Sequence, residues 1–107
     1  MSTLEQGDKL AGAGAVGPRV TLDGMKDKIK SEQYFHPDCA PHVTICVLEV
    51  ENGFILVGHS APADPANYDE GKGKTFAKDD ALRELWALEG YLLRQKLYDN
   101  YESDHVV

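Results

Sequence analysis

The dipeptide Asn52-Gly53, set between two short apolar runs, is the feature that most restricts how this chain can fold. Residues 43–50 are rich in β-branched side chains, and the apolar pattern resumes over residues 54–57. Because Asn-Gly readily adopts the positive φ angles of a two-residue type I′ turn, the sequence predicts a β-hairpin in which Glu51 and Phe54 are partners.

This turn also fixes which side chains share a face of the hairpin. It predicts three cross-strand pairs on one largely apolar face: Val50 with Ile55, Leu48 with Val57, and Cys46 with His59. We expect this face to pack against helices. The opposite face is expected to be half apolar and half small or polar.

The segments on either side of the hairpin show helical spacing. Before it, the apolar residues that recur at this spacing are Leu22, Met25 and Ile29. Thr21 precedes them as an N-cap, which predicts a helix of about 12 residues. After the hairpin, a longer helix is predicted from about Pro65, with an apolar stripe that continues to Leu97 and a bend allowed at Gly90.

These elements predict an α+β fold: an N-terminal helix, an antiparallel β-hairpin and a long or bent C-terminal helix packed on one sheet face. The 107 residues have room for one core. We expect residues 1–18, which hold four glycines among small residues, to form a flexible arm. Residues 19–99 would form the domain, and the polar residues 100–107 a frayed tail.

The charge and hydropathy of the chain restrict its partners and location. With 11 basic and 18 acidic residues, the formal net charge is −7, which opposes direct binding of nucleic acid. No apolar run approaches the roughly 20 residues that span a bilayer, and residues 1–6 lack the pattern of a secretory signal. We therefore expect a cytoplasmic protein without membrane contact.

A single two-stranded sheet is marginally stable in water and leaves its edges unpaired. We therefore expect self-association, most simply as a two-fold dimer that extends the sheet or pairs the long helices.

The candidates for catalysis and metal binding are few. Cys46 and His59, as predicted neighbours, would form a nucleophile and a base, but a packed core pair is the preferred interpretation. His36, Cys39 and His42 share one loop without the ligand spacing of a zinc site. We expect no enzymatic activity, no metal and no cofactor.

Two sets of residues are candidates for binding. Residues 71–75 hold a Gly-Lys-Thr ending, but position 68 is Tyr where a phosphate-binding loop has glycine. Lys72 and Lys74, with Tyr68, are therefore expected at most to attract a small anionic ligand. The second set, a candidate interaction surface, comprises Trp86, Tyr91 and Arg94.

Several motifs resemble those of a family of small proteins of tailed phages, named after a gene 49 product and a gene 66 product. The motifs are Asn52-Gly53-Phe54, Gly58, Ser60-Ala61, Tyr68-Asp69, Gly73, Ala77, Ala81, Trp86 and residues 88–93 (Leu-Glu-Gly-Tyr-Leu-Leu), with Arg19-Val20-Thr21 and Tyr34-Phe35 upstream. About three quarters of the chain is covered, and residues 86–93 are the most specific part. The chain departs from the family pattern at His59, where an acid is expected, and at Ala87, where proline is frequent.

The resemblance implies a phage or prophage product and no particular reaction. Small accessory proteins of phages often neutralise host factors, including defence systems. The sequence thus predicts an accessory protein that binds, and inhibits or sequesters, a host factor in the host cytoplasm. The alternatives are sequestration of a small anionic nucleotide, a minor enzyme using Cys46 and His59, or a structural component of the virion.

Overall fold

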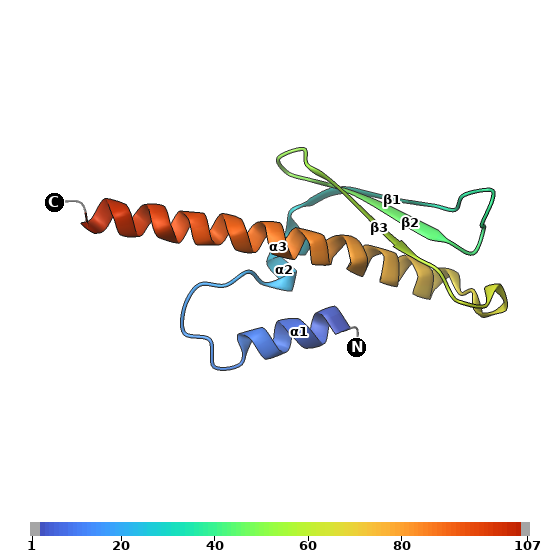
Figure 1. Ribbon diagram of the computed structural model, residues 1–107, viewed down its shortest axis with the longest axis horizontal. Helices are drawn as coiled ribbons and strands as arrows, with labels where there is room; N and C mark the ends of the chain where they lie inside the picture. The colour runs from blue at the N-terminus through green and yellow to red at the C-terminus, as the bar shows by residue number, and fades with distance from the viewer. Residues whose placement is uncertain (1–2, 106–107) are drawn as a thin grey trace.

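A three-stranded antiparallel sheet and one long helix form the framework of the protein (Figure 1). The computed structural model describes residues 3–105. Its elements are α1 (Thr3–Gly12), α2 (Leu22–Asp27), β1 (Ile29–Phe35), β2 (Thr44–Val50), β3 (Ile55–Ser60), the 3-10 turn η1 (Pro65–Asn67) and α3 (Glu70–His105). α3 packs across one face of the sheet, so the predicted α+β class is confirmed.

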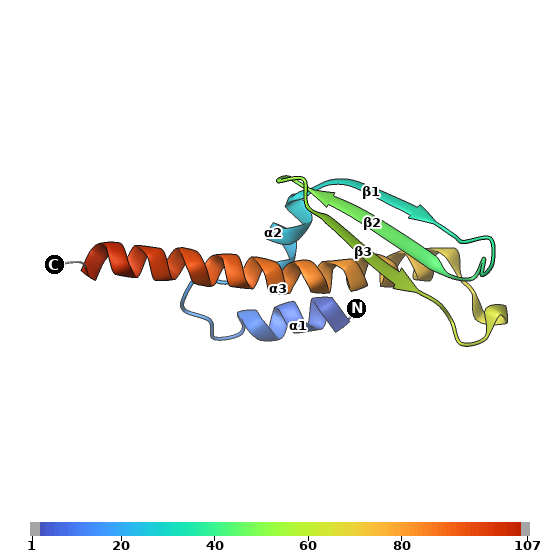
Figure 2. The same cartoon turned by 45° about the horizontal axis from the view of Figure 1, so that its top comes forward.

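α3 is longer than the sheet that it covers. Its 36 residues continue through Gly90 without a break, and its C-terminal half extends beyond the sheet (Figures 1 and 2). It also continues to His105, where the sequence predicts a frayed tail; Val106 and Val107 lie outside the described residues. None of the helices in residues 3–105 combines the length and the apolar character that a bilayer crossing requires.

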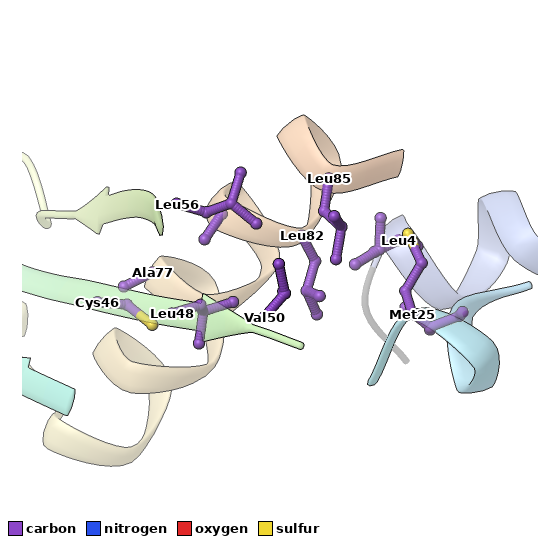
Figure 3. Close-up of a cluster of buried hydrophobic side chains, with 11 residues drawn as sticks. Leu4, Met25, Cys46, Leu48, Val50, Leu56, Ala77, Leu82 and Leu85 are labelled. Carbon is purple, nitrogen blue, oxygen red and sulfur yellow. The ribbon is translucent and has the colours of Figure 1, made fainter. Parts of the chain in front are cut away.

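β2 is the central strand, and its residues alternate between the two faces of the sheet. Thr44, Cys46, Leu48 and Val50 are buried toward α3, as period-two geometry requires. In the core they meet small and apolar residues of α3, including Ala77, Leu82 and Leu85 (Figure 3). The predicted helix-facing side of this strand is therefore correct.

The predicted hairpin turn is wrong by one residue. The Val50 N–H donates to the Phe54 carbonyl (3.1 Å), and the Gly53 N–H donates to the Val50 carbonyl (2.8 Å), so the loop has three residues. Gly53 has φ 89°, whereas no described residue other than glycine has a positive φ, which excludes a type I′ turn at Asn52. The loop is closed as a G1 bulge, and the Asn52 side chain accepts from the Phe54 N–H (3.0 Å).

The longer loop shifts the register of β3 against β2 by one residue, and this shift changes which side chains of β3 point toward α3. Leu48 lies opposite Leu56, Cys46 opposite Gly58, and Ile45 opposite His59. Because side chains alternate, the one-residue shift moves Ile55, Val57 and His59 from the predicted helix side to the other face. β3 buries Leu56 and Gly58 instead.

Gly58 is a point of close approach between the sheet and α3. A Cβ atom at this position would lie 2.1 Å from the Ala77 carbonyl oxygen and 2.5 Å from the Ala81 nitrogen. Both are backbone atoms of α3, so the space that a side chain would occupy is taken by the helix itself. Glycine here, with Ala77 and Ala81 opposite, sets the distance between sheet and helix.

The predicted N-terminal helix is half as long as expected, and a third strand follows it. Thr21 is the N-cap, since its hydroxyl accepts from the Gly24 N–H (3.0 Å), but α2 has six residues. The chain then enters β1 at Ile29, which lies opposite Val50, and the Glu51 N–H donates to the Lys28 carbonyl (3.0 Å). Pairing with β2 thus overrides the local helical spacing.

Where the sequence predicts a flexible arm, the structure has α1. Leu4 has 3 % of its surface exposed and joins the core beside Met25. α1 lies on the side of α3 away from the sheet (Figures 1 and 2). Asp8 ties it to α2, because one carboxylate oxygen accepts from Arg19 Nη1 (2.9 Å) and from the Leu22 N–H (3.0 Å). Met1 and Ser2 lie outside the described residues.

Candidate functional site

The sheet face that points away from α3 is the first candidate for function, and we call it the open face. Each strand contributes alternate residues, and those that lie opposite one another share the face: Ser31, Gln33 and Phe35 of β1, Ile45, Val47 and Glu49 of β2, and Ile55, Val57 and His59 of β3. None of the elements within residues 3–105 covers it (Figure 2).

An apolar band crosses the open face diagonally. It runs from Ile55 through Val57, Val47 and Ile45 to Phe35. The exposed fractions are 49 % for Ile55, 53 % for Val57 and 48 % for Phe35, which is high for large apolar side chains; Val47 and Ile45 of the central strand between them are half-buried. A contiguous apolar patch of this kind marks a binding surface more often than isolated exposed residues do.

The rim of the open face is polar. The Ser31 hydroxyl lies 3.5 Å from Glu49 Oε1, and His59 Nδ1 lies 3.6 Å from Asp80 Oδ2 on α3. The same Asp80 oxygen accepts from the His59 N–H (3.0 Å), so α3 partly closes the outer edge of β3. An apolar centre with a polar rim is the usual composition of a protein–protein interface.

The structure separates the two residues of the proposed catalytic pair. Cys46 is fully buried on the helix side, opposite Gly58, whereas His59 lies on the open face. Burial raises the pKa of the Cys46 thiol, which disfavours the nucleophilic thiolate. The neighbouring Tyr34 hydroxyl donates to Glu32 (2.6 Å), and burial with this bond raises the Tyr34 pKa. The expected contact of Cys46 with His59 is therefore wrong.

The loop between β1 and β2 holds two of the histidines, His36 and His42, and the other cysteine. His36 Nδ1 lies 2.7 Å from the Val43 carbonyl, and the Tyr68 hydroxyl lies 3.4 Å from His36 Nε2. The rings of His36 and Tyr68 meet edge to face, with centroids 5.7 Å apart. Cys39 is exposed. Among the described residues, no three His, Cys, Asp or Glu side chains are placed to hold a metal ion.

The predicted anion-binding residues are only partly brought together. Tyr68 and Lys72 line one hollow of about 150 Å³ beside Pro62, which is below the roughly 300 Å³ at which small-molecule pockets begin. Lys74 lies elsewhere, with its Nζ 3.5 Å from Glu70 and 5.6 Å from the centre of the Tyr34 ring.

The predicted interaction surface on α3 is divided in a similar way. Trp86 is half-buried and packs against the core, whereas Tyr91 is 74 % exposed. Five residues at about 100° each place these two side chains roughly 140° apart around the helix. Arg94 lies near Tyr91 and not near Trp86.

A groove between α2 and α3 was not found by sequence reasoning. Its main hollow, of about 210 Å³, is lined by Arg19, Val20, Thr21, Gly24, Met25, Lys28, Glu89, Leu92, Leu93 and Lys96. Lys28 Nζ lies 2.6 Å from Glu89 Oε2 across it. Lys28 is visible in the sequence, but its partner Glu89 lies 61 residues away on α3, so the sequence gives no local signal for the groove.

The fold and these surfaces define a small α+β protein that buries the Cys46 thiol and exposes an apolar sheet face. The chain belongs to the phage protein (N4 Gp49/phage Sf6 gene 66) family, whose sequence model matches residues 20–97. The resemblance inferred from the motifs is thus confirmed, and the match runs from just before α2 into the C-terminal half of α3. No curated protein and no solved structure matches the chain.

Proposed function

We propose that this phage protein acts by binding a host protein through the open face of its sheet, and that binding inhibits or sequesters that partner. The apolar band on the open face is the observation that carries the proposal. Its side chains are held out to water by the sheet, and their burial against a partner is favourable by about 25 cal/mol for each Å² of apolar surface.

The size of the open face indicates how the partner would bind. Three strands about 4.8 Å apart, with about seven residues at 3.3 Å each, cover roughly 330 Å². A standard interface buries about 800 Å² on each partner. The open face would therefore be the centre of the interface, and the partner would also contact its polar rim and the adjoining loops.

The charge of the open face favours a protein as its partner. None of its nine residues is Lys or Arg, and the chain carries a net charge of −7. A nucleic acid, whose affinity depends on phosphate contacts with basic residues, would find no such contact here. A host protein, such as a factor of a defence system, is the partner class that this surface fits.

We also propose that the chain forms the two-fold dimer that its sequence predicts. β1 is an edge strand with β2 beside it, and an edge of this kind can pair with a second copy. Leu97 and Tyr98 are exposed on the part of α3 that extends past the sheet, and they offer the alternative contact.

The proposal is tested by recovery of the tagged chain from host cells, followed by mass spectrometry of the bound proteins. Val57→Lys places a charge in the middle of the apolar band. Ala87→Lys, at an exposed position on α3, adds the same charge away from the open face. We expect one or more host proteins to be recovered with the wild type and with Ala87→Lys, and to be lost with Val57→Lys. Equal recovery with all three chains would refute the proposal.

A further inference from the structure

The groove between α2 and α3 collects cations on an otherwise acidic protein. Arg19, Lys28 and Lys96 line its main hollow; Glu89, the one carboxylate in the lining, pairs with Lys28, and Asp8, outside the lining, pairs with Arg19. The whole chain has 11 basic residues and a net charge of −7, so three cations around one hollow depart from the overall balance. An anionic group would therefore be drawn to this groove and repelled by much of the remaining surface.

Two of these cations retain free capacity for an anion. Lys96 is exposed, and its side chain has no hydrogen-bond or ion-pair partner among the side chains that the structure describes, those of residues 3–101. Arg19 uses Nη1 for Asp8 and for the Val20 carbonyl, which leaves the rest of its five N–H donors for another acceptor. Lys28, by contrast, is engaged by Glu89 at 2.6 Å.

The groove also has an apolar floor that continues along α3. Met25, Val20, Leu92 and Leu93 form the floor of the main hollow. Glu89 and Leu92 also line a second hollow of about 180 Å³, which ends at Leu88 and at Phe54 of the hairpin. The two hollows thus adjoin, with cations around one and apolar side chains around the other.

We propose that this groove binds an acidic peptide segment of a partner protein, with one large apolar side chain in the hollow beside Phe54 and carboxylates directed at Arg19 and Lys96. Each hollow is smaller than the roughly 300–1,000 Å³ of a small-molecule pocket, which suits single side chains of a peptide. The groove lies on the helix side of the sheet, so the inference does not depend on binding at the open face.

The Lys28–Glu89 ion pair gives the proposal a distinctive consequence. Glu89 competes with the peptide carboxylates for Lys28, and it is the only acid in the lining of either hollow. Removal of its charge by Glu89→Gln would release Lys28 and raise the affinity for an acidic peptide. A gain of binding is a result that damage to the fold does not produce.

The test uses a fluorescein-labelled peptide of four glutamates around one leucine, titrated with the full chain at low salt while fluorescence polarisation is recorded. We expect Glu89→Gln to bind about 2- to 5-fold more tightly and Lys96→Gln about 2- to 5-fold more weakly, the range for one exposed charge contact. Arg94→Gln, which removes an exposed charge outside the groove, should bind as the wild type does.

Two further probes test the two halves of the groove. A peptide with lysine in place of glutamate, and one with serine in place of leucine, should both bind at least 10-fold more weakly. Val57→Lys should leave peptide binding unchanged, so a failure at the open face remains distinguishable from a failure here. Absence of binding at millimolar peptide, or equal effects of the Lys96 and Arg94 variants, would overturn the proposal.

Discussion

The contact between Gly58 and α3 supports a quantitative prediction about stability. In Gly58→Ala the new methyl group would lie 2.1 Å from the Ala77 carbonyl oxygen and 2.5 Å from the Ala81 nitrogen. Real Cβ atoms do not approach that closely, and backbone atoms of a helix cannot rotate away as a side chain can. The strand and the helix would have to separate, which strains the pairing of β3 with β2 and opens the core around Cys46.

The expected loss of stability in Gly58→Ala follows from the measured free-energy cost of overpacking a protein core. Extra methylene groups forced into packed cores cost about 1–3 kcal/mol, and a clash with backbone on both sides belongs at the upper end. For a domain of this size each kcal/mol lowers the melting temperature by roughly 4–8 °C. Gly58→Ala should therefore melt on the order of 10–20 °C below the wild type.

Gly90→Ala is the matched control for this experiment. It makes the same chemical change within α3, where an added Cβ meets nothing within 4 Å. Alanine is favoured over glycine in a helix by about 0.5–1 kcal/mol, so this variant should melt at or above the wild type. Thermal unfolding followed by circular dichroism compares the three chains. A Gly58→Ala variant as stable as the wild type would refute the close approach of β3 to α3.

Three other properties can be checked with purified protein. The hydrogen bonds from Leu22 and Arg19 hold the pKa of Asp8 below its ordinary value of 3.8. The ionised carboxylate therefore stabilises the fold above pH 3.8, and this contribution is lost as the pH falls through the lowered pKa. Asp8→Asn should therefore lower the melting temperature at pH 7, and this loss should shrink as the pH falls below 3.8. In thiol labelling with a disulfide reagent, the exposed Cys39 should react within minutes, whereas the buried Cys46 should react at the rate of unfolding. Fast reaction of both thiols in the native state would contradict the burial of Cys46. Light scattering should give twice the mass of the chain at micromolar concentration, and a monomer would count against the proposed dimer.

The strongly periodic parts of the fold could be predicted from the sequence. The alternation along residues 44–50 places Leu48 and Val50 toward the core, and the apolar stripe from residue 77 onward gives α3. Both signals are local, and each repeats over several turns or strand residues. The family motifs also lie mainly in these segments.

The register of the hairpin could not be settled by the same reasoning. Asn-Gly fits a two-residue type I′ turn and equally a three-residue loop in which Gly53 alone of the pair has a positive φ. Both loops suit the local sequence, and the packing decides between them, because Gly58 and not His59 can lie against Ala77. A choice between turn types that differ by one residue reverses the faces of an entire strand.

The elements without a local pattern were missed for a related reason. β1 is polar over Lys30, Ser31, Glu32 and Gln33, and its pairing with β2 is a long-range contact. α1 has one buried residue, Leu4, which is too little to define a periodicity. The groove between α2 and α3 likewise exists only once Lys28 and Glu89, which are distant in the chain, are brought together.

Photocrosslinking from the open face tests directly whether this surface binds a host protein. A benzoylphenylalanine at position 57, where the side chain is half exposed, would be irradiated in host cells, with the same residue at position 87 as the control. If the open face binds a host protein, position 57 should give an adduct with that protein that is absent from position 87. Identical adducts from both positions, no adduct from position 57, or an adduct with a second copy of the chain alone would contradict the proposed binding.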